Sequence, residues 1–239
     1  YDPLDRDLDE KGEINHIDAA VRAVEELTGR RKQGDIMIFM PTEQDIRETR
    51  ELLSGRLREE AAILPLFSRL TRSEQERVFQ PMNLRKIIIA TNVAETSLTI
   101  PGIRYVIDTG LARISQYNPR SRTAGLPVRS ISQSSADQRK GRCGRVENGI
   151  CIRLFTEEDY LGRPLYTSPE ILRSNLAGVI LRMLALGLGD IDAFPFIDRP
   201  APKSIRDGID ILLELGAIER EEDESRRKSD PWRLTERGR

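Results

Sequence analysis

The sequence predicts an α/β fold, with a parallel β-sheet that carries helices on both faces and a smaller helical unit after it. Short and continuously apolar runs, such as residues 36–40 and 87–90, are typical of strands that are buried on both sides. Between such runs, apolar residues three and four positions apart, as in residues 14–27, indicate amphipathic helices. Because parallel strands need a crossover connection, strands that alternate with helices indicate a parallel sheet.

The elements of this first domain follow one another in a regular order. We expect strands at residues 35–40, 62–66, 86–91, 105–108 and 149–155. We expect helices at residues 14–27, 43–57, 73–79 and 136–144, and a β-hairpin at residues 111–132 with Gly125 near its turn. Ligands of such sheets bind beyond the carboxyl ends of the strands, so chemistry is expected in the loops that follow Met40, Leu66, Thr91 and Asp108.

A second domain is predicted after a change of composition near residues 161–169. We therefore place the two domains at residues 1–163 and 164–239. The second contains two helical patterns, with Gly216 at the position that closes a helix, and then two short strands around a polar stretch. The helices are expected at residues 171–184 and 205–213, and the strands at residues 217–218 and 232–235. This order is that of a winged helix, and the abrupt end at Arg239 suggests that the domain is truncated there.

The composition argues against several classes of protein. Lys and Arg (38) balance Asp and Glu (39), so the net charge gives no sign of a nucleic-acid partner. No run approaches the roughly 18–20 apolar residues of a membrane span, and no basic and apolar leader is present. Cys143 and Cys151 fit neither a disulfide framework nor a zinc spacing, which favours a reducing cytoplasm and a packing role for both. The single histidine, His16, argues against histidine-based catalysis and is expected to be structural or exposed.

The distribution of charge is uneven even though the total is balanced. Residues 101–145 contain nine basic side chains and two acidic ones. This segment lies between predicted core strands and is interleaved with Tyr117, Pro119 and Gly125, which favours a phosphate-facing surface. The compensating acidic stretches, at residues 2–13 and 219–224, are interpreted as solvated surface.

The sharpest motif in the chain is QRKGRCGR, at residues 138–145. Arg142 and Arg145 are three positions apart, so on a helix they project from one face, and two guanidinium groups so placed can clamp a transferring phosphoryl group. Gly141 and Gly144 would cost helix stability, which makes sense if a backbone or a ligand approaches closely. On these residues alone, a basic surface helix interrupted by glycines is an equal alternative.

The arrangement QRxGRxGR resembles motif VI of superfamily 2 helicases, and other segments extend the resemblance to the DEAH-box branch. ATNVAETSLTI at residues 90–100 is similar to motif V of that branch almost letter for letter. Further similar segments are IFMP at residues 38–41 (motif IV), LPLFSRL at 64–70 (motif IVa) and ERVFQP at 76–81, which in the family carries an adenine-stacking Phe. Lys140, Cys143 and residues 149–154 resemble the bacterial HrpA-type subgroup. The segments stand in the family's order and spacing and cover nearly the whole chain.

The resemblance implies a RecA-like sheet and a nucleotide site. By position in the motifs, Arg142 and Arg145 would be arginine fingers on the γ-phosphate, and Gln138 would position the attacking water. Phe79 would stack on adenine; from its spacing alone, a core aromatic of an amphipathic helix is the alternative. Thr99 would lie near the ribose; the family often has Asp where this chain has Pro101, so no carboxylate contact to the ribose is implied.

The resemblance also implies an RNA site. Ser68, Thr91, Asn92 and Thr96 would contact the RNA backbone, a role without sequence information that short hydroxyl and amide groups suit. Ser97 would couple the RNA and nucleotide sites, and helix capping is the alternative for Thr96 and Ser97. The hairpin resembles the one that DEAH helicases place where a duplex splits. Its basic residues Arg113, Arg120, Arg122 and Arg129 would hold nucleic acid by charge.

Two parts of such a motor are missing from the sequence. No GxxxxGK[ST] loop and no DEAH tetrapeptide occurs in it. The resemblance implies that these motifs and the Mg²⁺ ligands belong to a first RecA-like domain before Tyr1, so this fragment alone should be inactive. The implied assembly is a cytoplasmic, monomeric, ATP- and Mg²⁺-dependent RNA helicase without a membrane partner. It would act on single-stranded RNA, RNA duplexes or RNA–protein complexes, and contain C-terminal helical and OB regions in the same polypeptide.

Two alternatives remain from the sequence. One is a translocase that acts on DNA, because contacts to the backbone alone do not separate the two substrates. The other is a non-catalytic nucleic-acid-binding module whose second winged-helix helix reads a duplex. Asp207, Asp210 and Glu214 in that helix would repel phosphate, so we expect the winged helix to be a packing hinge instead.

Overall fold

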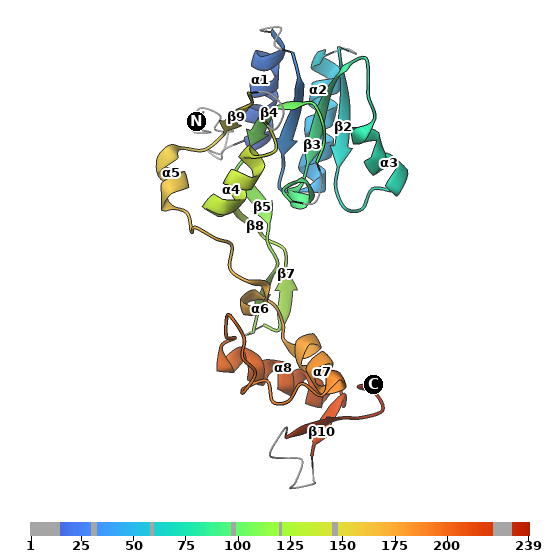
Figure 1. Ribbon diagram of the computed structural model, residues 1–239, viewed down its shortest axis with the longest axis vertical. Helices are drawn as coiled ribbons and strands as arrows, with labels where there is room; N and C mark the ends of the chain where they lie inside the picture. The colour runs from blue at the N-terminus through green and yellow to red at the C-terminus, as the bar shows by residue number, and fades with distance from the viewer. Residues whose placement is uncertain are drawn as a thin grey trace. The chain divides into compact units, whose positions relative to one another are not determined.

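The computed structural model describes residues 15–29, 33–57, 60–96, 99–119, 121–144, 148–221 and 231–239. The chain divides into two compact units. The first contains the chain up to Ile114 and residues 128–167, and the second contains residues 115–127 and the chain from Ser168 onward (Figure 1). The tip of the predicted hairpin thus belongs to the second unit, and the domain boundary after residue 163 stays a prediction.

The first unit is built on a five-stranded sheet in the order β2-β3-β1-β4-β9, in which every neighbouring pair is parallel. The strands are β1 (Asp35–Phe39), β2 (Ala61–Leu66), β3 (Arg85–Ala90), β4 (Ile103–Asp108) and β9 (Ile150–Arg153). In the central strand, Ile36 is level with Ile87 of β3 and with Tyr105 of β4. The predicted parallel sheet is confirmed, with each strand within three residues of its expected limits.

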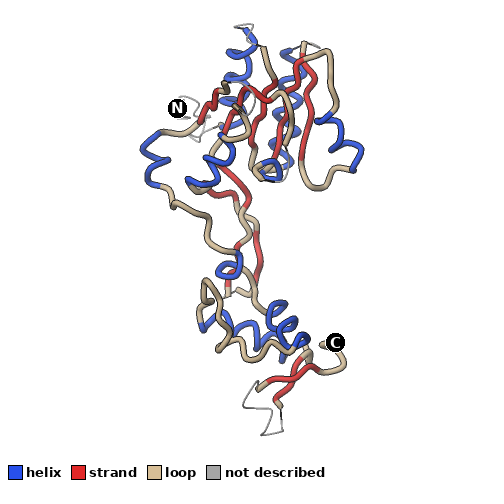
Figure 2. Tube along the Cα trace, viewed as in Figure 1, coloured by secondary structure: helices blue, strands red, loops and turns tan. Residues whose placement is uncertain are grey.

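Successive residues of each strand point to opposite faces of the sheet, and both faces are buried. One face packs against the helices α1 (His16–Gly29) and α2 (Glu43–Leu57). Its strand residues are Ile36, Ile38, Ile87, Ile89, Tyr105 and Ile107. The opposite face, which we call the second face, presents Met37, Phe39, Ile88, Ala90 and Val106. Shorter elements cover this second face (Figure 2).

The connection from β2 to β3 is a split helix. Thr71 caps α3 (Arg72–Glu76) in a reciprocal box with Glu74, and the 3-10 helix η2 (Arg77–Phe79) follows directly. Val78 of η2 is fully buried against the second face. A further 3-10 turn, η3 (Asn92–Ala94), follows β3 and buries Ala94 against the same face.

Helix α4 (Gln133–Lys140) begins three residues earlier and ends four residues earlier than predicted, so the expected helix at 136–144 is wrong at both ends. Ser132 caps its start, with its Oγ accepting a hydrogen bond from the Ser135 backbone. The chain leaves the helix at Gly141, and Gly144 has a φ of 78°, which a left-handed turn requires. Arg142 therefore lies in a turn and not on a helix face.

The remaining elements of the first unit border this helix. The base of the hairpin pairs β5 (Leu111–Arg113) with β8 (Val128–Ser130) in antiparallel fashion. The helix α5 (Glu157–Gly162), which was not predicted, begins at a Thr156 cap. Ala112, Ile131, Ala136 and Phe155 form a small core beneath α4.

The second unit contains the hairpin tip and the C-terminal elements. In the tip, β6 (Gln116–Asn118) pairs antiparallel with β7 (Thr123–Gly125), so the predicted hairpin is confirmed. The other elements are α6 (Glu170–Arg173), α7 (Ala177–Leu186), α8 (Pro202–Glu214), β10 (Ile218–Arg220) and β11 (Trp232–Leu234). Their core includes Ile180, Met183, Ile205, Leu212 and Ile218. The order of elements fits the predicted winged helix, which stays a prediction.

Helix ends in the second unit follow the local sequence. The expected helix at 171–184 is broken between α6 and α7, because the Asn175 side chain accepts a hydrogen bond from the Ala177 backbone and starts a new helix. The predicted stop at Gly216 is confirmed, with a φ of 63°, and α7 ends in the same way at Gly187, with a φ of 62°. Only glycine adopts this left-handed conformation without strain.

Candidate functional site

The carboxyl ends of the strands are tied together by their first loop residues. The backbone of Met40 donates to Ala90 (2.8 Å), and that of Thr91 donates to Leu66 (3.1 Å). The Thr109 hydroxyl donates to the carbonyl of Phe39 (2.8 Å), which joins the end of β4 to the end of β1. The loops after β1, β2, β3 and β4 therefore meet at one edge of the sheet, as predicted for parallel strands.

Three of the predicted RNA contacts lie at or next to this edge. Ser68 follows β2 by two residues and is exposed, and Thr91 follows β3 directly and is half-buried. Asn92, at the start of η3, is exposed, as is Thr96 farther along the same loop. Ser97 lies outside the described residues. These positions of the edge therefore offer hydroxyl and amide groups.

The predicted nucleotide contacts come from segments that cover the second face. Phe79, Thr99 and Arg142 each stand beside a residue that packs into this core, and those neighbours are Val78, Ile100 and Cys143. Phe79 itself is 36% exposed although Val78 is fully buried. The interpretation of Phe79 as a core aromatic is therefore wrong, and its ring is available on the surface of the segment.

Gln138 and Arg142 are linked through the backbone at the end of α4. Gln138 is exposed on the helix, and its carbonyl accepts a hydrogen bond from Arg142 Nε (3.3 Å). The backbone of Arg142 donates to the carbonyl of Arg139 (3.0 Å). Arg145 lies outside the described residues, so its pairing with Arg142 stays a prediction.

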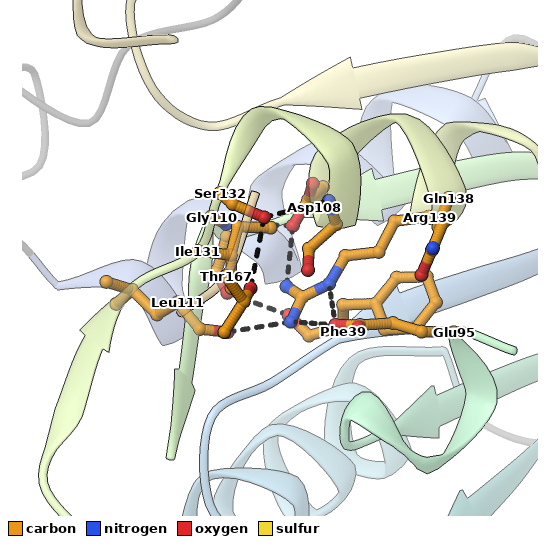
Figure 3. A network of polar contacts seen from close by, with 12 residues as sticks. Phe39, Glu95, Asp108, Gly110, Leu111, Ile131, Ser132, Gln138, Arg139 and Thr167 are labelled. Atoms are coloured by element: carbon orange, nitrogen blue, oxygen red, sulfur yellow. Dashed lines mark hydrogen bonds and ion pairs between the residues drawn. The ribbon is translucent and has the colours of Figure 1, made fainter. Parts of the chain in front are cut away.

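The predicted phosphate-facing segment is wrong for Arg139, whose side chain is 0% exposed. Its Nη1 donates to Asp108 Oδ1 (2.8 Å), and its Nε donates to Glu95 Oε1 (2.8 Å). Its Nη2 donates to the Leu111 carbonyl (3.1 Å), and the guanidinium carbon lies 4.8 Å from the centroid of the Phe39 ring. Figure 3 shows this network, in which segments from four parts of the chain converge on one side chain.

The sequence contains one local pattern that indicates the burial of Arg139. Ser132, Ala136 and Arg139 are spaced four and three positions apart, so on a helix they share one face. All three are buried in the structure. The partners of Arg139 are 31 and 44 residues away in the sequence, so the periodicity could show the face but not the acceptors.

The network contains fewer cations than carboxylates. Burial alone would lower the pKa of Arg139, but the carboxylates of Asp108 and Glu95 outweigh it and raise that pKa, so the guanidinium stays charged. Burial also raises the pKa of Glu95, and Arg139 offsets part of this shift. Asp108 Oδ1 accepts a second hydrogen bond from the Gly110 backbone (2.8 Å), whereas its buried Oδ2 has no hydrogen-bond partner. One guanidinium therefore pairs with two carboxylates.

A second ion pair holds α4 from another side. Arg153 Nη2 of β9 donates to Asp137 Oδ1 (2.7 Å), and the Tyr160 hydroxyl donates to Asp137 Oδ2 (3.0 Å). The guanidinium of Arg153 also lies 4.1 Å from the centroid of the Tyr160 ring. Helix α4 is thus fixed to β9 and α5 through Asp137.

The hairpin tip is bonded to α8 within the second unit. Arg122 Nη1 donates to both carboxylate oxygens of Glu214 (2.7 and 2.8 Å), and its Nε donates to Asp207 (3.3 Å). The Tyr117 hydroxyl donates to the same Asp207 (2.7 Å). The charge of Arg122, predicted to hold nucleic acid, is met here by protein carboxylates. These bonds are also the reason that the tip belongs to the second unit.

Three other basic residues of the hairpin are predicted to hold nucleic acid. Arg113 and Arg129 are exposed on its base strands, and Arg120 lies outside the described residues. The basic segment as a whole is therefore not one phosphate-facing surface, because Arg139 is buried and Arg122 is paired with α8.

The two cysteines and the histidine lie against other side chains of the protein. Cys143 and Cys151 pack against the core of the second face, and burial raises the pKa of both thiols, that of Cys151 to about 12. His16 Nε2 lies 3.6 Å from Asp45 at the start of α2. Within the described ranges, no group of three or more His, Cys, Asp or Glu side chains could hold a metal ion. No helix within them has the length and apolar character to span a bilayer.

The parallel sheet, the short polar loops at its carboxyl edge and the glycine-interrupted arginine segment over its second face define the class of RecA-like helicase domains. Residues 19–147 match the family model of the helicase conserved C-terminal domain, and the chain belongs to this family.

Relatives of known name agree with this assignment. The chain is 54% identical over 231 residues to the ATP-dependent RNA helicase HrpA of Escherichia coli (strain K12), covering 97% of this chain and 18% of that protein. It is 54% identical over 214 residues to the HrpA homolog of Haemophilus influenzae, covering 90% of this chain and 16% of that protein. A crystal structure of the Escherichia coli DEAH/RHA helicase HrpB is similar with a TM-score of 0.83 at 31% identity, over 100% of this chain and 28% of that one. The chain thus spans less than a fifth of the two HrpA proteins.

Proposed function

We propose that this chain is the second RecA-like half, with its adjoining smaller domain, of the motor core of an ATP-dependent RNA helicase. The motor would couple ATP hydrolysis to translocation on single-stranded RNA and to the remodelling of duplexes or RNA–protein complexes. The observation that carries the proposal is the arrangement of one sheet. Candidate nucleotide contacts border its second face, and candidate RNA contacts lie at its carboxyl edge. The names of the two HrpA relatives support the same activity.

The nucleotide would bind between the segments that cover the second face and a first RecA-like domain. Arg142 would stabilise the charge that develops on the γ-phosphate, Gln138 would orient the attacking water, and Arg145 would be a second finger. Phe79, exposed at the end of η2, would stack on adenine, and Thr99 would lie near the ribose. We propose that Mg²⁺ is held by the first domain, as the motif resemblance implies, and assign no step of this chain to it.

RNA would run along the carboxyl edge of the sheet. Ser68, Thr91, Asn92 and Thr96 would hydrogen-bond its sugar–phosphate backbone, and Ser97 would couple this site to the nucleotide. Arg113 and Arg120 of the hairpin would add electrostatic attraction. Arg122 is left out of this set, because Asp207 and Glu214 already bind it. The two acidic residues also support a packing role for α8 over the reading of a duplex.

The test is the activity of the full-length protein with different nucleic acids. We expect Mg²⁺-dependent ATPase activity that single-stranded poly(U) RNA stimulates, together with unwinding of an RNA duplex that has a single-stranded tail. Equal stimulation by single-stranded DNA would favour a DNA-directed translocase. Nucleic-acid binding without any ATPase activity would contradict the proposal and favour a non-catalytic binding module.

A further inference from the structure

The Arg139 network joins the two sites that the proposed function needs, and nothing in that function uses it. Glu95 lies between Asn92 and Thr96, on the segment assigned to RNA. Arg139 lies between Gln138 and Arg142, on the segment assigned to the nucleotide. Two donors of the guanidinium, Nε (2.8 Å) and Nη2 (2.7 Å), reach the same Oε1 of Glu95. One side-chain contact therefore connects the two segments directly (Figure 3).

Stability alone does not explain this arrangement. Removing charged groups from water is costly, and apolar residues of similar volume often stabilise a core as well as a buried ion pair does. Asp108 alone would balance the charge of Arg139, and it does so from the end of a sheet strand. Glu95 adds a second carboxylate, and Asp108 Oδ2 remains buried without a hydrogen-bond partner. The network therefore contains one carboxylate more than the charge of Arg139 requires. That additional carboxylate, Glu95, belongs to the segment assigned to RNA.

The two carboxylates hold the guanidinium from different kinds of structure. Asp108 ends β4, a strand paired on both sides, so it is a fixed anchor. Glu95 follows the 3-10 turn η3 in a loop, and its backbone donates to the carbonyl of Asn92 (3.0 Å). A shift of the loop would therefore move Glu95 relative to Asp108. Because the guanidinium is a rigid fork, Arg139 could keep its contacts to both carboxylates only within the limits of that geometry.

We propose that Glu95 and Arg139 are positioning residues that transmit RNA binding to the nucleotide site. RNA held at Thr91, Asn92 and Thr96 sets the place of Glu95, and Glu95 sets the guanidinium of Arg139 against Asp108. The backbone of Arg139 then places Gln138 and Arg142, since the Arg142 N–H donates to the Arg139 carbonyl. This inference rests on the proposed function.

The test measures the coupling between two ligands in the full-length protein. The affinity for a non-hydrolysable ATP analogue is measured with and without single-stranded poly(U) RNA, and the ratio of the two is the coupling factor. In Glu95→Ala, Asp108 still neutralises Arg139, so we expect a folded protein. Its coupling factor should fall at least about fivefold, toward one, while the RNA-free affinity for the analogue stays the same. The affinity for RNA with and without the analogue should show the same loss, because coupling of affinities is reciprocal.

Two further variants separate coupling from a merely structural role. Glu95→Gln keeps an acceptor of the same shape, so its coupling factor should lie between those of Glu95→Ala and the unmodified protein. The matched control is Asp137→Asn, which removes an ion pair from the same helix but on the side of Arg153. We expect its coupling factor to be unchanged.

The outcomes distinguish this inference from the function on which it rests. If the unmodified protein shows RNA-stimulated ATPase activity and both Glu95 variants keep its coupling factor, the inference is wrong and the function stands. The inference is also wrong if Asp137→Asn loses as much coupling as Glu95→Ala, because the helix and not the Glu95 contact would then matter. An unmodified protein without RNA stimulation would overturn both.

Discussion

At the scale of single residues, the buried side chain of Arg139 links the segments that carry the candidate site residues. A guanidinium without access to water is tolerated only where its donors have acceptors, and three of its nitrogens meet Glu95, Asp108 and the Leu111 carbonyl. The same motif places Arg142, three residues later, in a turn at the surface of the segment. Arginines of one motif thus serve a structural and a candidate catalytic role.

This division of roles predicts a loss of stability in Arg139→Ala. The variant leaves Asp108 and Glu95 buried without a cation, which costs about 3–5 kcal/mol when one partner of a buried pair is removed. The measurement is the thermal unfolding of the domain within the full-length protein. The control is Arg129→Ala on the exposed face of β8, which should change stability by less than about 0.5 kcal/mol. An Arg139→Ala protein as stable as this control would contradict the network.

At the scale of elements, the hairpin is split between two units, and its tip is held by α8. The bonds of Tyr117 and Arg122 to Asp207 and Glu214 fix the tip in one orientation. Exposed ion pairs are weak individually, but here a tyrosine and an arginine converge on the same helix. The tip is therefore positioned as part of the second unit.

The tip should matter for strand separation more than for hydrolysis. Shortening residues 120–126 in the full-length protein should slow duplex unwinding, while the RNA-stimulated ATPase rate stays within about twofold, because no candidate nucleotide contact belongs to the tip. Arg122→Glu should slow unwinding by about threefold, the scale of an exposed ion pair. Combining it with Glu214→Arg should restore the rate. Failure of the exchange to restore unwinding would show that Arg122 acts on nucleic acid and not on α8.

The elements show how far the sequence could predict the fold. The limits of α2 and the glycine stop of α8 could be predicted, because both depend on apolar spacing and on local conformation. The start of α4 could not, because the N–H groups of Gln133 and Ser134 donate to the carbonyls of Pro164 and Leu165, about thirty residues away. The break before α7 depends on one Asn175 hydrogen bond that does not disturb the apolar pattern.

The candidate site also has features that the sequence could predict and features that it could not. The parallel topology predicts the edge at which Thr91 lies, and the motif resemblance identifies Arg142. The burial of Arg139 and the pairing of Arg122 depend on contacts across 31 to 92 residues. No local pattern contains these partners.

At the scale of the whole molecule, the proposed function makes the chain one side of a composite site. Candidate nucleotide contacts and RNA contacts lie on different borders of the same sheet, so a change of position of the sheet against a partner domain would act on both. The sequence contains no phosphate-binding loop, and most of the affinity for ATP would come from outside this chain. In the proposed function, Arg142 acts on the transition state of hydrolysis and not on the binding of either ligand.

The most direct measurement is the ATPase kcat of Arg142→Ala in the full-length protein, alongside its affinities for an ATP analogue and for RNA. We expect kcat to fall about 10³-fold, the scale of an arginine finger, while the affinity for the analogue changes much less and nucleotide-free RNA binding stays the same. Arg142→Lys should not restore the rate, because a point charge does not reproduce a planar fork that spans two oxygens. An Arg142→Ala protein with unchanged kcat and weakened RNA binding would contradict the account, because this segment would then belong to the RNA path.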